Sequence, residues 1–264
     1  MYIRKMILSG IGLLSVFIFT VCTTGNINDR GIVTNGNTSL PDTLAVSSDE
    51  SKIDTLALNI NFSPSGDYLS VKSKSATLKG QLKTLPDSIQ KEKFEAYILN
   101  EIIPFWYKTP WDFNGYTDVP GKGVIACGYF VSTVLKHAGL NINRYTMAQQ
   151  NPKNEARTIA GNDSMYIYTC NASELQQIFN EQHPEGLYFA GLDFHVGFLL
   201  FRKKELYFIH SNYIGSEGVI FEKAVFSEAF NASQKYFISA VSTNPDFIQK
   251  WMNFIKIEVI TEKK

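Results

Sequence analysis

The strongest constraint on the fold is a series of short apolar runs in the second half of the chain. The runs are rich in β-branched and aromatic residues and are separated by polar turns, which is typical of strands. They are Gly186–Leu192, His195–Phe201, Leu206–His210, Gly218–Phe221 and Tyr236–Val241. Consecutive strands joined by short turns predict an antiparallel meander.

The segments around this meander have helical patterns. We expect helices at Pro86–Ile103, Cys127–His137, Ser173–Gln182 and Asp246–Phe254. Pro104 should stop the first helix, Gly139 should cap the second, and Ser173 with Gln176 fits a capping box for the third. A long loop rich in Gly, Pro and aromatic residues, 105–123, separates the first two helices. Helices followed by a meander predict an α+β fold rather than alternating βαβ units.

Composition narrows the class of protein. The chain has 264 residues, of which 44% are hydrophobic and 19% charged, as expected for one globular domain or at most two small ones. Lys and Arg together number 25, as do Asp and Glu, so no basic excess indicates a nucleic-acid partner. Three Cys and four His are too few for a disulfide framework or a His-rich metal protein.

Residues 1–22 have the layout of a signal peptide. Arg4 and Lys5 precede an uncharged run from Met6 to Val21, which is shorter than the roughly 18–20 residues of a membrane span. The run ends at Cys22 and resembles a bacterial lipoprotein signal, in which the Cys becomes the lipidated first residue. The alternatives are an ordinary signal peptide with an incidental Cys, or an uncleaved anchor. We therefore expect an exported lipoprotein, anchored to a membrane of the bacterial cell envelope through Cys22.

Residues 23–85 are expected to form a tether and an N-terminal arm. The stretch up to about Ile53 is polar and has no helical or alternating pattern. Residues 55–85 contain apolar alternations, such as 56–60 and 68–71, that predict strands or an ordered arm. The folded domain is then expected at 86–264.

Cys127 lies where a loop turns into a helix, in the stretch Gly123–Val131. Unpaired N–H groups and the positive end of the helix dipole stabilise a thiolate there, and the thiolate is the nucleophilic form of Cys. Gly128 would leave backbone room for a substrate carbonyl. The alternative for a lone Cys is a buried structural residue.

Two histidines lie at the open end of one predicted hairpin. His195 begins a strand, His210 ends the next, and the polar residues 202–205 form the turn. With a two- or four-residue loop, the numbers of paired residues sum to 407, so His195 faces Asn212 and is the diagonal neighbour of His210 on the same face. Either residue could orient the His195 ring, as an imidazole base requires.

These residues resemble the NlpC family of cell-wall cysteine peptidases, which have a compact papain-like fold. The family's Cys-Gly-Phe-Val-type helix start is similar to Cys127–Val131, with Tyr129 extra or shifted. Its His-Val-Gly strand corresponds to His195–Gly197, and its second strand end to Phe208–Ser211. Family members commonly have Asp before the Cys and Ser after it, whereas this chain has Ala126 and Gly128, and its stretch between Cys and His looks longer.

The resemblance implies hydrolysis of an amide bond in peptidoglycan stem peptides, typically between D-glutamate and a diamino acid. It implies Cys127 as nucleophile, His195 as base and His210 as the orienting residue, without a metal or cofactor. The family's aromatic loop lines the site and corresponds to 111–115. The expected substrate-binding residues are Trp111, Asp112, Tyr116, Gly128, Arg144 and Asn212.

Two other functions remain open. One is an amidase or acyltransferase that acts on another substrate with the same scaffold. The other is a non-catalytic lipoprotein that binds a cell-wall or sugar ligand through Trp111 and Tyr116. Lone residues also have ordinary alternatives: Arg144 as a solvated surface charge, Cys170 as a small core residue, and His137 and His183 as surface residues. Asp193 is expected to point away from His195.

Overall fold

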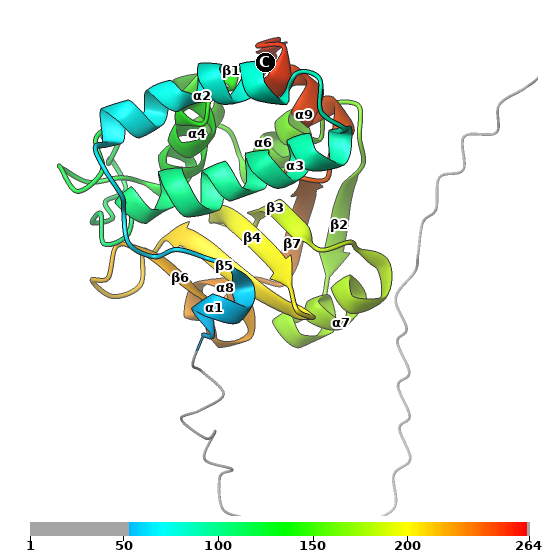
Figure 1. Cartoon of the computed structure of the whole chain (residues 1–264). Helices are drawn as coiled ribbons and strands as arrows, with labels where there is room; N and C mark the ends of the chain where they lie inside the picture. Colours follow the sequence, from blue (N-terminus) through cyan, green and yellow to red (C-terminus); the bar gives the residue numbers. More distant parts are fainter. Residues whose placement is uncertain (1–52, 263–264) are drawn as a thin grey trace, which may run out of the picture. The chain divides into compact units, whose positions relative to one another are not determined.

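A six-stranded antiparallel sheet lies at the centre of the protein (Figure 1), whose computed structural model describes residues 53–262. The strand order is β2-β7-β3-β4-β5-β6, in which β3 to β6 form a meander and β7 returns beside β3. The strands are β2 (Met165–Thr169), β3 (Gly186–Gly191), β4 (Val196–Arg202), β5 (Glu205–Ser211), β6 (Val219–Lys223) and β7 (Lys235–Ala240). A separate parallel pair joins β1 (Asn141–Ile142) to β8 (Lys256–Ile257). The α+β fold predicted from the sequence is confirmed.

The β4–β5 hairpin has the predicted register. Phe198 pairs with Ile209 and Arg202 with Glu205, so paired residue numbers sum to 407. Lys203 and Lys204 form the two-residue turn with φ of 54° and 63°. Positive φ at both turn residues matches the right-handed twist of the flanking strands, which fixes this register.

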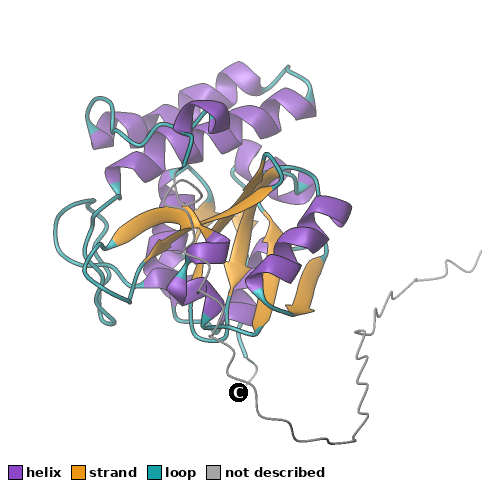
Figure 2. Ribbon diagram, turned by 90° about the horizontal axis from the view of Figure 1, so that it is seen from below, coloured by secondary structure: helices purple, strands orange, loops and turns teal. Residues whose placement is uncertain are grey.

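Helices cover both faces of the sheet (Figures 1 and 2). One face carries α2 (Tyr68–Leu82), α3 (Asp87–Ala96), α4 (Cys127–His137), α6 (Pro152–Ala160) and α9 (Pro245–Met252). The other carries α7 (Ala172–Gln182) and α8 (Glu228–Asn231). Along β3, Leu187 and Phe189 join the first core cluster, whereas Tyr188 and Ala190 join the second. Successive side chains of β3 therefore pack alternately into the two cores, as the two-residue period of a strand requires.

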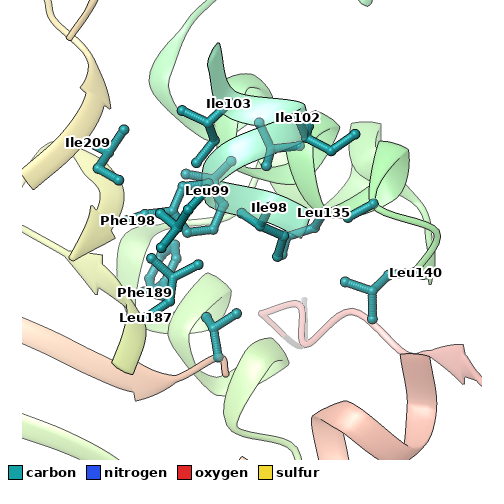
Figure 3. Packing of buried hydrophobic residues seen from close by; sticks show 14 of the residues in the cluster. Ile98, Leu99, Ile102, Ile103, Leu135, Leu140, Leu187, Phe189, Phe198 and Ile209 are labelled. Carbon is teal, nitrogen blue, oxygen red and sulfur yellow. The ribbon is translucent and has the colours of Figure 1, made fainter. Parts of the chain in front are cut away.

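The first core contains a π-helical segment between α3 and α4. After α3 the chain continues as a π-helix, Tyr97–Ile102, and a 3-10 turn, Ile103–Phe105. Figure 3 shows Ile98, Leu99 and Ile102 packed with Phe198 of the sheet and Leu135 of α4. The helix predicted to stop before Pro104 thus changes its pitch instead, and Pro104 fits near the start of the 3-10 turn because it has no N–H to pair.

Residues 55–58 and 68–82 are helical rather than extended. Asp54 accepts hydrogen bonds from the N–H groups of Leu56 and Ala57 at the start of α1 (Thr55–Leu58), and Asp67 caps α2 in the same way. Leu58, Val71 and other apolar residues of this stretch lie in the first core cluster. The expected arm therefore belongs to the packed domain, and the capping aspartates override the apolar alternation that predicted strands.

The other predicted elements differ in their ends. The capping box of α7 uses Asn171 and Glu174 rather than Ser173 and Gln176. The chain also forms α5 (Arg144–Ala148) between α4 and α6. The predicted signal peptide, the lipidated Cys22 and the polar tether up to about residue 53 lie outside the described residues. Within 53–262, no helix is long and apolar enough to cross a membrane.

Candidate active site

Cys127 is the first residue of α4. Ala126 precedes it in an extended conformation and makes no side-chain capping bond, so the first turn of the helix has no side-chain acceptor from its N-cap. The backbone N–H groups of Cys127, Gly128 and Val196 interact with the Cys127 thiol and favour its ionised form. Since Val196 follows His195, the sulfur lies beside the peptide group that joins these two residues.

Burial nevertheless keeps Cys127 protonated at neutral pH. Removal from water raises the pKa of the thiol to about 11, and the carboxyl of Glu155 contributes in the same direction, against the effect of the N–H groups. A pKa lowered by the helix N-terminus was expected, and this expectation is wrong, because the effect of burial is larger than that of the N–H groups. The thiol, rather than the thiolate, is therefore the favoured form of Cys127 in this structure.

His195 and His210 form a buried pair. Nε2 of His195 lies 2.8 Å from Nδ1 of His210, and Nε2 of His210 lies 2.9 Å from Oε1 of Glu222. His195 directly precedes β4, His210 lies in β5 and Glu222 lies in β6. Three neighbouring strands therefore position the three hydrogen-bonded side chains. The placement of the two rings predicted from the hairpin is confirmed.

The hydrogen bonds from His195 through His210 to Glu222 fix the tautomer of each ring. The Glu222 carboxylate accepts a hydrogen bond, so Nε2 of His210 carries the proton and its Nδ1 is an acceptor. Nε2 of His195 must then donate to His210, which leaves Nδ1 of His195 with a free lone pair. Burial lowers the pKa of both histidines, and the neighbouring ring lowers that of His195 further. Both rings are therefore neutral at pH 7, and Nδ1 of His195 can accept a proton.

Sequence analysis missed Glu222. The predicted strand ended at Phe221, one residue before it. In the structure His210 pairs with Ile220, so Glu222 is the diagonal neighbour of His210 on the same face. The same parity argument that joined His195 to His210 would have found Glu222 if the strand had been extended by one residue.

Asn212 does not share the role of His210. Its side-chain oxygen accepts a hydrogen bond from the N–H of Ile214, and its amide nitrogen lies 3.5 Å from Glu217. Asn212 therefore stabilises the turn that follows β5, and of the two candidates it is His210 that bonds to His195.

Arg144 is buried inside the protein. It is 3% exposed, and its guanidinium donates hydrogen bonds to the carbonyl oxygen of Tyr116 and the hydroxyl groups of Thr133 and Tyr145. The interpretation as a solvated surface charge is wrong. Its hydrogen bonds anchor the loop that precedes α4, which leaves it poorly placed to bind a substrate carboxylate.

Gly128 does not open onto a substrate. A Cβ at this position would lie 2.9 Å from the carbonyl oxygen of Ala148 and 3.0 Å from Oε1 of Glu155. Gly128 therefore allows α4 to approach α5 and α6 closely, and the room predicted for a substrate carbonyl is filled by the protein. This close approach also explains why a larger residue does not follow the Cys here.

Aromatic side chains lie beside the histidines. The ring of Tyr213 lies 4.9 Å from that of His195 and 6.2 Å from that of Trp111. Tyr213 is 38% exposed and was not among the residues predicted from the sequence. Through this contact Trp111 lies at the site. The ring of Tyr116 lies beside that of Tyr129 instead, and the Asp112 carboxylate accepts a hydrogen bond from the N–H of Asn114.

The remaining Cys and His residues lie in other surroundings. Cys170 is half-buried at the end of β2, where burial raises its pKa to about 11. His137 is buried and bonds to the hydroxyl of Tyr68, so its prediction as a surface residue is wrong. His183 is half-buried and bonds to the hydroxyl of Tyr168. Asp193 accepts a hydrogen bond from the N–H of Gln234, away from His195.

Among residues 53–262, no group of three or more His, Cys, Asp or Glu side chains is arranged to hold a metal ion. Comparison of the chain with protein-family models, with curated proteins and with solved structures found no match. The arguments for its function therefore come from its own site: a Cys at a helix start beside a His–His–Glu chain.

Proposed function

We propose that the protein is an exported cysteine hydrolase with a papain-like fold of the NlpC type, which cleaves an amide bond in peptidoglycan stem peptides. The observation that carries this proposal is the hydrogen-bonded chain from His195 through His210 to Glu222, next to a thiol at the start of α4. This arrangement supplies a nucleophile, a base and a group that orients the base.

The chemistry follows from the tautomers. His195 accepts the thiol proton at Nδ1 while the sulfur of Cys127 bonds to the substrate carbonyl carbon. Backbone N–H groups at the start of α4 stabilise the negative charge on the carbonyl oxygen. His195 then gives the proton to the leaving amine, the C–N bond breaks, and an acyl-enzyme thioester remains. A water molecule, deprotonated by His195, releases the acid and restores the thiol.

His210 and Glu222 support the charge that develops on His195. When His195 becomes an imidazolium, its Nε2–H donates to His210, whose own Nε2–H donates to a carboxylate. A buried imidazolium would otherwise be costly, since burial disfavours the charged form. The Glu222 carboxylate therefore stabilises an ion pair that forms only during the reaction.

The proposed substrate depends on the resemblance of Cys127–Val131 and His195–Gly197 to the cell-wall peptidases. The exposed ring of Tyr213, between Trp111 and His195, gives a substrate an aromatic surface next to the base. We propose the bond between D-glutamate and the diamino acid of the stem peptide as the one cleaved.

Digestion of purified peptidoglycan tests this proposal. The wild-type protein should release fragments that mass analysis identifies as stem peptides cut after D-glutamate, and Cys127→Ala should release none. Cys170→Ala is the matched control, because it removes the other described thiol, and it should act like wild type. Transfer of the acyl group to an added amine without hydrolysis would instead identify an acyltransferase, and intact peptidoglycan would contradict the proposal.

We also propose that the protein is a lipoprotein anchored through Cys22. The uncharged run from Met6 to Val21 and the polar stretch that follows it support this proposal. Cys22→Ser should abolish both labelling by a fatty-acid analogue and recovery in the membrane fraction. Unchanged labelling and fractionation would contradict it.

A further inference from the structure

Glu155 is a buried carboxyl group with no charged partner. It lies in α6, is 2% exposed, and its Oε2 has no hydrogen-bond partner among the described residues. None of the ion pairs within residues 53–262 includes it. A carboxylate in such a place is very costly, so burial favours the neutral form of the carboxyl group.

Glu155 packs directly against the helix of the nucleophile. Its Oε1 lies 3.0 Å from the point where a Cβ on Gly128 would be, and the carbonyl oxygen of Ala148 lies 2.9 Å from the same point. Since Gly128 follows Cys127, the carboxyl group reaches the first turn of α4 through the space that the missing side chain leaves.

Other charged groups near α6 do not neutralise Glu155. The elements packed against α6 are α4, α5, β2, β3 and β7. Their cationic residues are Lys136 and Lys235, which are exposed, and Arg144, whose guanidinium is bonded to Tyr116, Thr133 and Tyr145. The cationic residues of α6 itself, Lys153 and Arg157, are also exposed, and His137 of α4 bonds to Tyr68. The remaining titratable groups on these elements are tyrosines and the Cys127 thiol. The Cys127 thiol is therefore the group whose charge the Glu155 carboxyl affects most directly.

We propose that Glu155 is a positioning residue that acts on Cys127 as a neutral carboxylic acid. In its protonated form it allows negative charge to develop on the sulfur, and in its ionised form it suppresses that charge. A negative charge on the buried carboxyl group disfavours a second negative charge on the sulfur. The proposal rests on the proposed function only in taking Cys127 as the nucleophile.

Burial raises the pKa of Glu155 well above its ordinary value, and Glu155 in turn contributes to the raised pKa of Cys127. Both pKa values are raised, as expected for two buried acids that lie near each other. A site of this kind works in a pH range in which Glu155 keeps its proton, and loses reactivity as Glu155 ionises.

Alkylation of Cys127 tests the proposal without any peptidase substrate. Iodoacetamide is added to the full chain at a series of pH values, and peptide mapping gives the rate at Cys127 for wild type and Glu155→Gln. The rates should agree at the acidic end of the series, where Glu155 keeps its proton, and diverge as pH rises, until Glu155→Gln reacts about tenfold faster. Glu181→Gln, an exposed carboxylate on α7, is the control and should follow wild type.

Two results would overturn the proposal. One is a Glu155→Gln profile that coincides with wild type at every pH. The other is a wild-type profile that fits one ionisation instead of two, which needs no variant and so decides the matter even if Glu155→Gln does not fold. If the profiles diverge but peptidoglycan stays intact, the hydrolase proposal fails and the action of Glu155 on the thiol stands.

Discussion

Nε2 of His195 and Nδ1 of His210 lie 2.8 Å apart in a hydrogen bond that is closed to solvent. This bond sets the proton on one nitrogen of His195 and leaves the other with a free lone pair, which in the proposed mechanism accepts the proton of Cys127. The two rings therefore form a unit. In the proposed mechanism only His195 transfers the proton, so its replacement should lower activity more than the replacement of His210.

Removal of each ring tests this inequality. His195→Ala should be nearly inactive, about 10²–10⁴-fold down in kcat, because the proton-transfer group is gone. His210→Ala should be impaired but measurable, since it only frees the ring that it orients. Asn212→Ala should leave kcat nearly unchanged, because its side chain bonds within the following turn. Wild-type activity in His210→Ala, with no activity in Asn212→Ala, would contradict this assignment.

Glu222 should matter through charge rather than shape. Glu222→Gln keeps the size of the side chain but removes the carboxylate that stabilises His210, and a hydrogen bond to a charged group is worth about 1.5–3 kcal/mol. We therefore expect kcat/KM to fall by about 10–100-fold. Glu205→Gln is a matched control, because Glu205 is another carboxylate of the sheet with one nitrogen partner, Lys223. Equal effects of the two variants would show that Glu222 has no special role.

How far the sequence predicts this site depends on how local each signal is. The hairpin of β4 and β5 was predictable with its register, because both strands and a two-residue turn are visible in the chain. Glu222 was missed because a strand boundary was placed one residue early, although the alternation rule covers it. Glu155 and the burial of Arg144, which was predicted as a substrate-binding residue, could not be found, since burial at both positions depends on how α5 and α6 pack beside α4.

Helices α1 and α2 show a different limit of prediction from the sequence. The apolar residues of 56–60 alternate as in a strand, but Asp54 and Asp67 supply helix caps. Packing of Leu58 and Val71 into the core then decides the outcome. The local hydrophobic pattern was enough to predict the strands of the meander. For α1 and α2, packing against the rest of the protein decides the structure.

The close packing at Gly128 predicts a cost for any side chain there. Gly128→Ala should lower the free energy of unfolding by about 1–3 kcal/mol, because its Cβ would press on Ala148 and Glu155. Gly80→Ala in α2 is the control, since a Cβ there meets nothing within 4 Å. It should be neutral or stabilising by about 0.5–1 kcal/mol. Chemical denaturation measures both, and a Gly128→Ala protein as stable as wild type would refute the packing argument.

His137 should make the protein sensitive to acid. Burial lowers its pKa to about 4 from 6.5, so below pH 6.5 the unfolded chain binds a proton that the folded protein does not bind until about pH 4. Stability therefore falls as pH decreases through this window. His137→Asn can keep a bond to Tyr68 but cannot titrate, so its Tm should fall less between pH 7 and 4.5 than that of wild type. Parallel losses of Tm would count against His137 as a source of acid sensitivity.

Cleavage of a defined stem peptide in heavy-oxygen water tests the central claim most directly. The substrate contains the bond between D-glutamate and the diamino acid, and mass analysis follows both products. We predict that the wild-type protein releases the diamino-acid fragment as a free amine and places one heavy oxygen atom in the new glutamyl carboxyl group, whereas Cys127→Ala leaves the peptide whole. An uncut peptide with the wild-type protein, or equal cleavage by Cys127→Ala, would contradict the account.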